Sequence, residues 1–87
     1  MTVYMVSREL PGITMDQLAA AQKSAIETSQ KFTAEGKPVS YIRSTFVPGD
    51  SSCMCLFEAA NPELVKQVNE TANIPFTDIV EALDLTP

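Results

Sequence analysis

Two kinds of apolar pattern alternate along the chain. Runs with a two-residue period, which is typical of strands, cover residues 2–9, 39–47, 52–59 and 77–83. Between them, two segments carry apolar side chains at every third or fourth position, the spacing of an amphipathic helix. The pattern therefore predicts the order strand, helix, strand, strand, helix, strand.

Turn and cap residues mark the ends of these elements. Thr14 and Gln17 have the spacing of a capping box and start the first helix, which Gly36 ends. Asn61 followed by Pro62 has the composition of a helix start and opens the second helix. Residues 48–51 read Pro-Gly-Asp-Ser and predict the turn of a hairpin between the second and third strands.

This order predicts an α+β, ferredoxin-like βαββαβ fold: a four-stranded antiparallel sheet with two helices on one face. The second and third strands are apolar on both faces, whereas a sheet with one face in water alternates apolar and polar residues. We therefore expect a second copy to cover the other face, as in a dimeric α+β barrel. Strict alternation places Tyr41 and Arg43 on the same face of the second strand.

Composition narrows the class of protein. The 87 residues predict one domain, residues 1–87, and the net charge of −5 argues against nucleic-acid binding. No apolar run is long enough to span a membrane, and the first residues do not have the pattern of a signal peptide. The sequence predicts a cytoplasmic protein that pairs with itself and binds neither nucleic acid nor membrane.

The residues that could hold a metal are few. The chain contains no histidine, and its two cysteines, Cys53 and Cys55, are two positions apart on one strand face. Free cysteines of this kind usually pack as small apolar side chains, so we predict no metal and no cofactor. Asn69 lies beside the apolar stripe of the second helix, and we expect it in solvent rather than in a cleft between helix and sheet.

Polar residues within the apolar strands are the best candidates for a site. We predict a small-molecule ligand held between sheet and helices, with Tyr41, Arg43, Cys55 and Glu58 around it. Arg43 would fix an anionic group, Glu58 would orient Arg43 or a ligand hydroxyl, and Tyr41 would pack on the ligand. The structural alternative is that these charges form an edge salt bridge or a pair at the dimer interface.

Two other functions fit the same pattern. The first is a cofactor-independent enzyme of the oxygenase or isomerase type, with Glu58 or Glu81 as the base, because dimeric α+β barrels host such enzymes. The second is an interaction module in which the charges only specify the dimer. No nucleophile–histidine pair and no glycine-rich phosphate loop is present.

Short motifs along almost the whole chain resemble one family. They are Arg8-Glu9 with residues 10–14, residues 41–44, residues 55–59, Asn61-Pro62-Glu63, Ile74-Pro75 and Val80-Glu81. The chain resembles the small ferredoxin-like proteins typed by a nickel-binding, nickel-responsive member. The resemblance implies a dimeric α+β barrel. Histidine-bearing members have histidine near the position of Val68, so the missing histidines disfavour a nickel-like site here.

Overall fold

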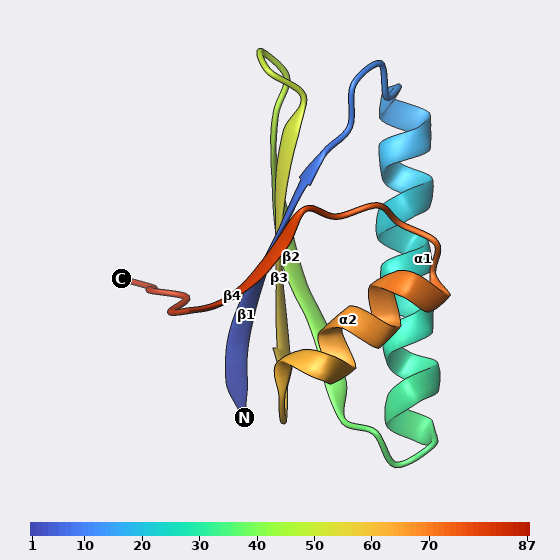
Figure 1. Ribbon diagram of the computed structural model, residues 1–87, viewed down its shortest axis with the longest axis vertical. Coiled ribbons are helices and arrows are strands. Elements are labelled where there is room, and N and C mark those ends of the chain that lie inside the picture. Colours follow the sequence, from blue (N-terminus) through green and yellow to red (C-terminus); the bar gives the residue numbers. More distant parts are fainter.

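The elements follow the predicted order (Figure 1). The computed structural model describes all residues, 1–87. Its elements are β1 (Thr2–Glu9), α1 (Met15–Ala34), β2 (Val39–Val47), β3 (Ser52–Ala59), α2 (Pro62–Thr71) and β4 (Asp78–Ala82). The last strand is one residue shorter at each end than the pattern predicts.

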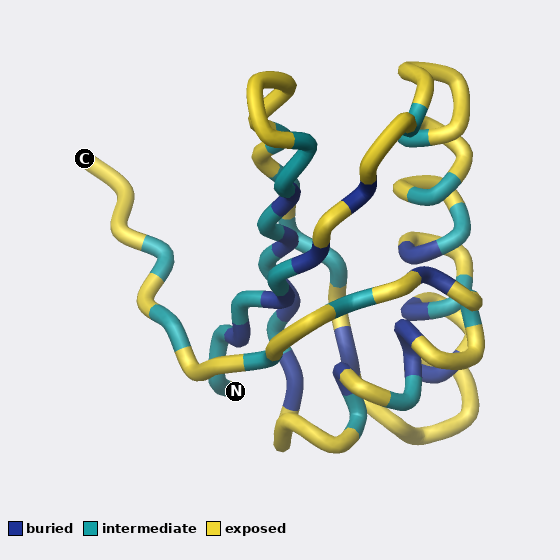
Figure 2. Tube along the Cα trace, turned by 45° about the horizontal axis from the view of Figure 1, so that its top comes forward, coloured by how far each residue is buried: buried dark blue, intermediate teal, exposed yellow.

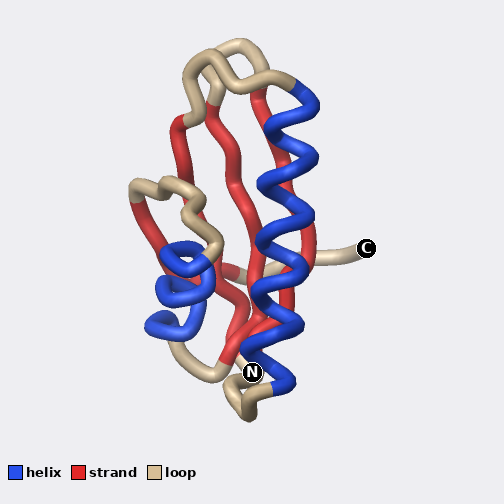
Figure 3. Tube along the Cα trace, turned by 90° about the vertical axis from the view of Figure 1, so that its right-hand side faces the viewer, coloured by secondary structure: helices blue, strands red, loops and turns tan.

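The four strands form one antiparallel sheet with the order β2-β3-β1-β4. Each helix joins an edge strand to a central one, so both helices lie on the same face of the sheet (Figure 3). This arrangement confirms the ferredoxin-like α+β fold.

Both helices begin where the cap residues predict. The Thr14 side chain accepts a hydrogen bond from the Gln17 backbone, and the Gln17 side chain accepts one from the Thr14 backbone, which completes the capping box of α1. At α2, the Asn61 side chain accepts a hydrogen bond from the backbone N–H of Leu64, with Pro62 in the first turn.

Strand β2 departs from the predicted alternation. A bulge interrupts its pairing with β3, so that Tyr41 lies opposite Phe57 whereas Arg43 lies opposite Leu56. The extra residue, Ile42, reverses the direction of every following side chain. The prediction that Tyr41 and Arg43 share a face is therefore wrong: Tyr41 is on the side of the helices and Arg43 is on the opposite side.

The core lies between the sheet and the helices (Figure 2). Its fully buried members come from β3 and α2 above all, and the Phe57 ring packs edge-to-face against Tyr41. Residues that alternate with these form the open face of the sheet, which we define by Val3, Met5, Met54, Leu56 and Val80. Most of the open face is half-buried, and no helix covers it.

The C-terminal tail, residues 83–87, leaves β4 on the side of the open face (Figures 1 and 3). Asp84 forms an ion pair of 3.0 Å with Arg43 on β2, the strand at the other edge of the sheet. The tail therefore reaches from the β4 edge toward β2 on the open-face side of the sheet. None of the helices is long and apolar enough to cross a membrane.

Candidate functional site

A cavity of about 150 Å³ lies between α1 and the helix-facing side of β2 and β3. Nine of its twelve lining residues are hydrophobic. We call it the α1 cavity and define it by Leu18, Ala21 and Gln22 of α1, by Phe46 and Ile74, and by four sheet residues whose side chains carry hydrogen-bonding groups: Arg8, Tyr41, Ser44 and Cys55. Arg8, Tyr41, Ser44 and Cys55 come from the sheet and Gln22 comes from α1, so hydrogen-bonding groups on both walls can orient a ligand while the rest of the lining is apolar.

Arg8 is the charged residue of this cavity. Arg8 is only 3% exposed, yet neither of the two ion pairs in the structure includes it. Its guanidinium donates three hydrogen bonds, none of them to a carboxylate: Nη2 to Asn69 Oδ1 at 2.9 Å, Nη1 to the Pro75 carbonyl at 3.2 Å and Nε to Cys55 Sγ at 3.4 Å. Arg8 is therefore a buried cation that hydrogen bonds hold in place without a carboxylate partner.

Asn69 of α2 orients that guanidinium. Its amide nitrogen donates to the Val65 carbonyl at 2.8 Å, which leaves Oδ1 to accept from Arg8. Asn69 is fully buried, so the prediction that it lies in solvent is wrong. The helix pattern could not indicate this contact because the two residues are 61 positions apart in the sequence.

A chain of hydrogen bonds runs along the cavity wall, and each group in it donates to the next, from Gln22 to Cys55. Gln22 Nε2 donates to the Tyr41 hydroxyl at 2.9 Å, and the Tyr41 and Ser44 hydroxyls are hydrogen-bonded to each other. Ser44 in turn donates to Cys55 Sγ at 2.9 Å. Because the amide nitrogen can only donate, the hydroxyl of Tyr41 is free to donate onward, and the chain ends at the Cys55 sulfur.

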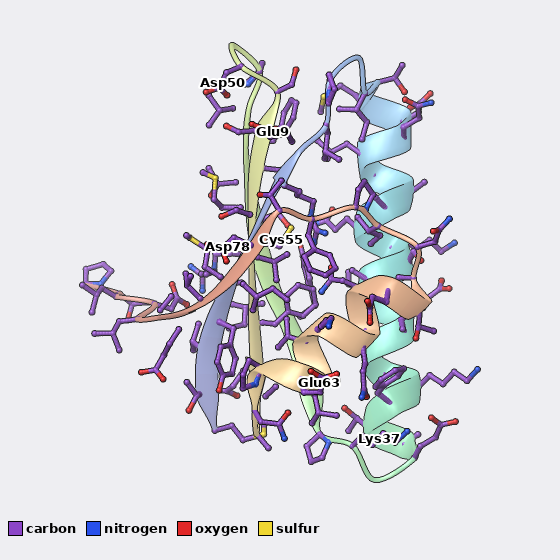
Figure 4. The ribbon with its side chains drawn as sticks, in the orientation of Figure 1. Glu9, Lys37, Asp50, Cys55, Glu63 and Asp78 are labelled. Carbon is purple, nitrogen blue, oxygen red and sulfur yellow. The ribbon has the colours of Figure 1, made fainter.

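Cys55 points from β3 toward the helices (Figure 4). Its sulfur lies 3.9 Å from that of Cys53, the next residue on the same face, and both thiols are free. The pKa of the Cys53 thiol is raised to about 11. Burial is the largest cause, and the charge of a neighbouring Cys55 thiolate is the second. Cys53 thus stays protonated at neutral pH, and its S–H can serve as a further donor to Cys55.

The four predicted site residues separate into two pairs. Tyr41 and Cys55 line the α1 cavity, connected through Ser44. Arg43 and Glu58 lie on the open face, where Arg43 pairs with Asp84 and Glu58 lies opposite Val3 and Ser40 in the sheet. The structure therefore does not bring the predicted four together.

Arg43 does not point toward a ligand between sheet and helices, because the bulge turned it outward. The cationic group in that position is Arg8. The sequence carried a signal for it, since Arg8 shares the two-residue period of Tyr4 and Val6 and so their buried face. No Asp or Glu lines the α1 cavity, and Glu81 is exposed. The use of Glu58 or Glu81 as a catalytic base stays a prediction.

Comparisons with known proteins agree with this fold. A family model described as "Nickel responsive protein SCO4226-like" matches residues 4–82, which confirms the resemblance read from the motifs. Among solved structures, the SCO4226 protein of Streptomyces coelicolor A3(2) superimposes with a TM-score of 0.81. It is 24% identical to this chain and the match covers 97% of this chain and 99% of that one. No curated protein matches.

Proposed function

We propose a function for this chain, which belongs to the family of SCO4226-like nickel-responsive proteins. The protein binds a small molecule in the α1 cavity and acts as a homodimer. The observation that carries the proposal is the cavity itself. Its apolar walls favour an apolar ligand body, and Arg8, Ser44 and Tyr41 supply convergent polar groups at one side. Ligand sites in proteins combine these two features.

The open face supports the homodimer. Of the open-face residues, Val80 is 41% exposed and Val3, Met5, Met54 and Leu56 are half-buried, and in the adjoining tail Leu83 and Leu85 are more than 80% exposed. Apolar side chains gathered on an uncovered sheet face mark an interaction surface. A domain of 87 residues also buries a modest share of its surface alone, so pairing would stabilise it.

A nickel site like the one the family name suggests does not fit the donors of this chain. No group of three or more histidine, cysteine, aspartate or glutamate side chains lies together. The two thiols that do lie together, those of Cys53 and Cys55, have the Arg8 guanidinium beside them, with Nε 3.4 Å from Cys55 Sγ. A divalent cation at these sulfurs would be repelled by Arg8, so we do not extend the nickel function to this chain.

Nuclear magnetic resonance of the amides tests ligand binding. We expect fragments of six to nine non-hydrogen atoms to shift the amides of Leu18, Ala21 and Ser44 in a saturable way. Ala21→Leu places a larger side chain in the cavity and should abolish the shifts. Ala20→Leu, on the exposed side of the same helix, should leave them unchanged. If no fragment shifts the cavity amides of the folded wild type, the binding proposal is wrong and the interaction module becomes the better hypothesis.

Analytical ultracentrifugation tests the homodimer. Met5 is central on the open face, between Leu56 and Val80 of the neighbouring strands, so Met5→Glu would place a charge inside a sheet–sheet interface. We expect wild type to sediment as a dimer and Met5→Glu as a monomer. Ala19→Glu, on the exposed side of α1, is the matched control and should remain dimeric. A monomeric wild type would refute the homodimer and leave the cavity proposal standing.

A further inference from the structure

We propose that the ligand of the α1 cavity carries one negative charge, a carboxylate on a small apolar body, and that this group pairs with the Arg8 guanidinium. The inference rests on the proposed binding function and names the class of its ligand. It follows from the charge, the unused donors and the size of the cavity.

The first argument is the unpaired charge of Arg8. A buried cation is normally accompanied by an anion, because its transfer from water costs several kcal/mol. Arg8 is 3% exposed and has no carboxylate within ion-pair distance. The three groups that accept its hydrogen bonds, on Asn69, Pro75 and Cys55, include no carboxylate. The interior thus holds a positive charge that an anionic ligand would balance.

The second argument is the number of donors left over. An arginine side chain has five N–H groups. Three of them donate to Asn69, Pro75 and Cys55, which leaves one N–H on Nη1 and one on Nη2. Arg8 also lines the cavity. Two N–H groups on adjacent nitrogens suit the two oxygens of a carboxylate, and charge-assisted hydrogen bonds of this type are the strong ones.

The third argument is the size and polarity of the remaining walls. A cavity of about 150 Å³ has the volume that accepts a benzene-sized molecule in engineered protein cores. Leu18, Phe46 and Ile74 present apolar side chains to it. The ligand that complements these walls is a short aliphatic or single-ring acid, and a phosphorylated or multiply charged compound would leave charges without partners.

One group of the protein itself competes for this role. Cys55 Sγ accepts hydrogen bonds from Ser44 and Arg8, and a thiolate there would supply the negative charge from within. In that case the charge of Arg8 would already be balanced without an anionic ligand. The test therefore has to separate a ligand carboxylate from an ionised Cys55.

The decisive experiment compares matched acids and amides on the folded, reduced wild-type protein at neutral pH. The probes are benzoate against benzamide and pentanoate against pentanamide, titrated by amide chemical shifts. We expect the acids to bind in the cavity at least about tenfold more tightly than the amides, equivalent to about 1.4 kcal/mol. Equal affinity would overturn the inference and keep the proposed function. Binding of neither series would contradict both.

Two arginine variants supply the control. Arg8→Gln should remove the preference for the acids, whereas Arg43→Gln, which lies outside the cavity, should retain it. Should Arg8→Gln fail to fold, the ultraviolet absorbance of thiolate in wild type and Cys55→Ala gives a second measurement. Equal absorbance at neutral pH supports the inference. A thiolate signal lost in Cys55→Ala would show that the protein balances Arg8 itself, and would overturn it.

Discussion

Arg8 and Arg43 are both arginines within strands, but they lie on opposite faces of the sheet and differ in exposure and in ion pairing. Arg43 lies on the open face with its side chain 55% exposed and has an acidic partner, Asp84. Arg8 lies on the helix side, 3% exposed, with no acidic partner. The comparison teaches that a charge inside a strand points to function only when it is buried and its partners leave it unbalanced.

The largest expected effect concerns the two faces themselves. Phe57 is fully buried under the helices, so Phe57→Ala should lower the free energy of unfolding by about 3–5 kcal/mol, measured by urea denaturation. Val80→Ala, at a position 41% exposed on the open face, should change it by at most about 0.5 kcal/mol in a monomeric background such as Met5→Glu. Comparable losses in both variants would mean that the open face is as tightly packed as the core.

The sequence predicted the fold because its signals were local. Thr14 with Gln17, and Asn61 with Pro62, mark helix starts through hydrogen bonds within a single turn, and each of these starts is confirmed. Arg43 was predicted beside the ligand, but the bulge at Ile42 places it on the other face of the sheet. The bulge arises from the pairing of β2 with β3, and isoleucine, an ordinary strand residue, gives no sign of it in the sequence.

The polar partners of the cavity were harder to predict than its apolar walls. Asn69 is beside Val68 in a helix pattern that is polar at many positions, and only contact with Arg8 from β1 explains why it is buried. That contact depends on how α2 packs on the sheet, which local periodicity does not specify. Tyr41 and Cys55, two of the four residues predicted around a ligand, both line the α1 cavity because β2 and β3 pair as a hairpin and Ser44 connects them.

A single substitution would make Arg8 resemble Arg43. Asn69→Asp places a carboxylate at the atom that now lies 2.9 Å from Arg8 Nη2, so the protein would supply the missing charge. We expect benzoate affinity to fall about tenfold or more, measured by amide shifts, while benzamide affinity is retained. Asn73→Asp, which adds the same charge at an exposed position after α2, is the control. Unchanged benzoate binding in Asn69→Asp would show that the carboxylate of the ligand does not pair with Arg8.

A smaller effect is expected from pH. The pKa of Cys53 is raised from 9.0 to about 11, so the folded state keeps this proton while the unfolded state loses it. This contribution to stability is present below pH 9 and is lost as pH rises toward 11. Wild type should therefore lose on the order of 1 kcal/mol more over this range than Cys53→Ala, by urea denaturation at each pH. Parallel curves for the two proteins would refute a raised Cys53 pKa.

The smallest effect should follow from removing the partner of Arg43. Asp84→Asn leaves that guanidinium without an anion, as Arg8 is now, but in a half-exposed position where water solvates the charge. The free energy of unfolding should fall by about 0–1 kcal/mol, and added salt should reduce even that difference. Benzoate binding should be unchanged, since Arg43 is not part of the cavity. A large loss of stability would instead mean that the ion pair between Arg43 and Asp84 is shielded from water, for example inside the proposed dimer, and repeating the measurement in Met5→Glu would then restore the small value.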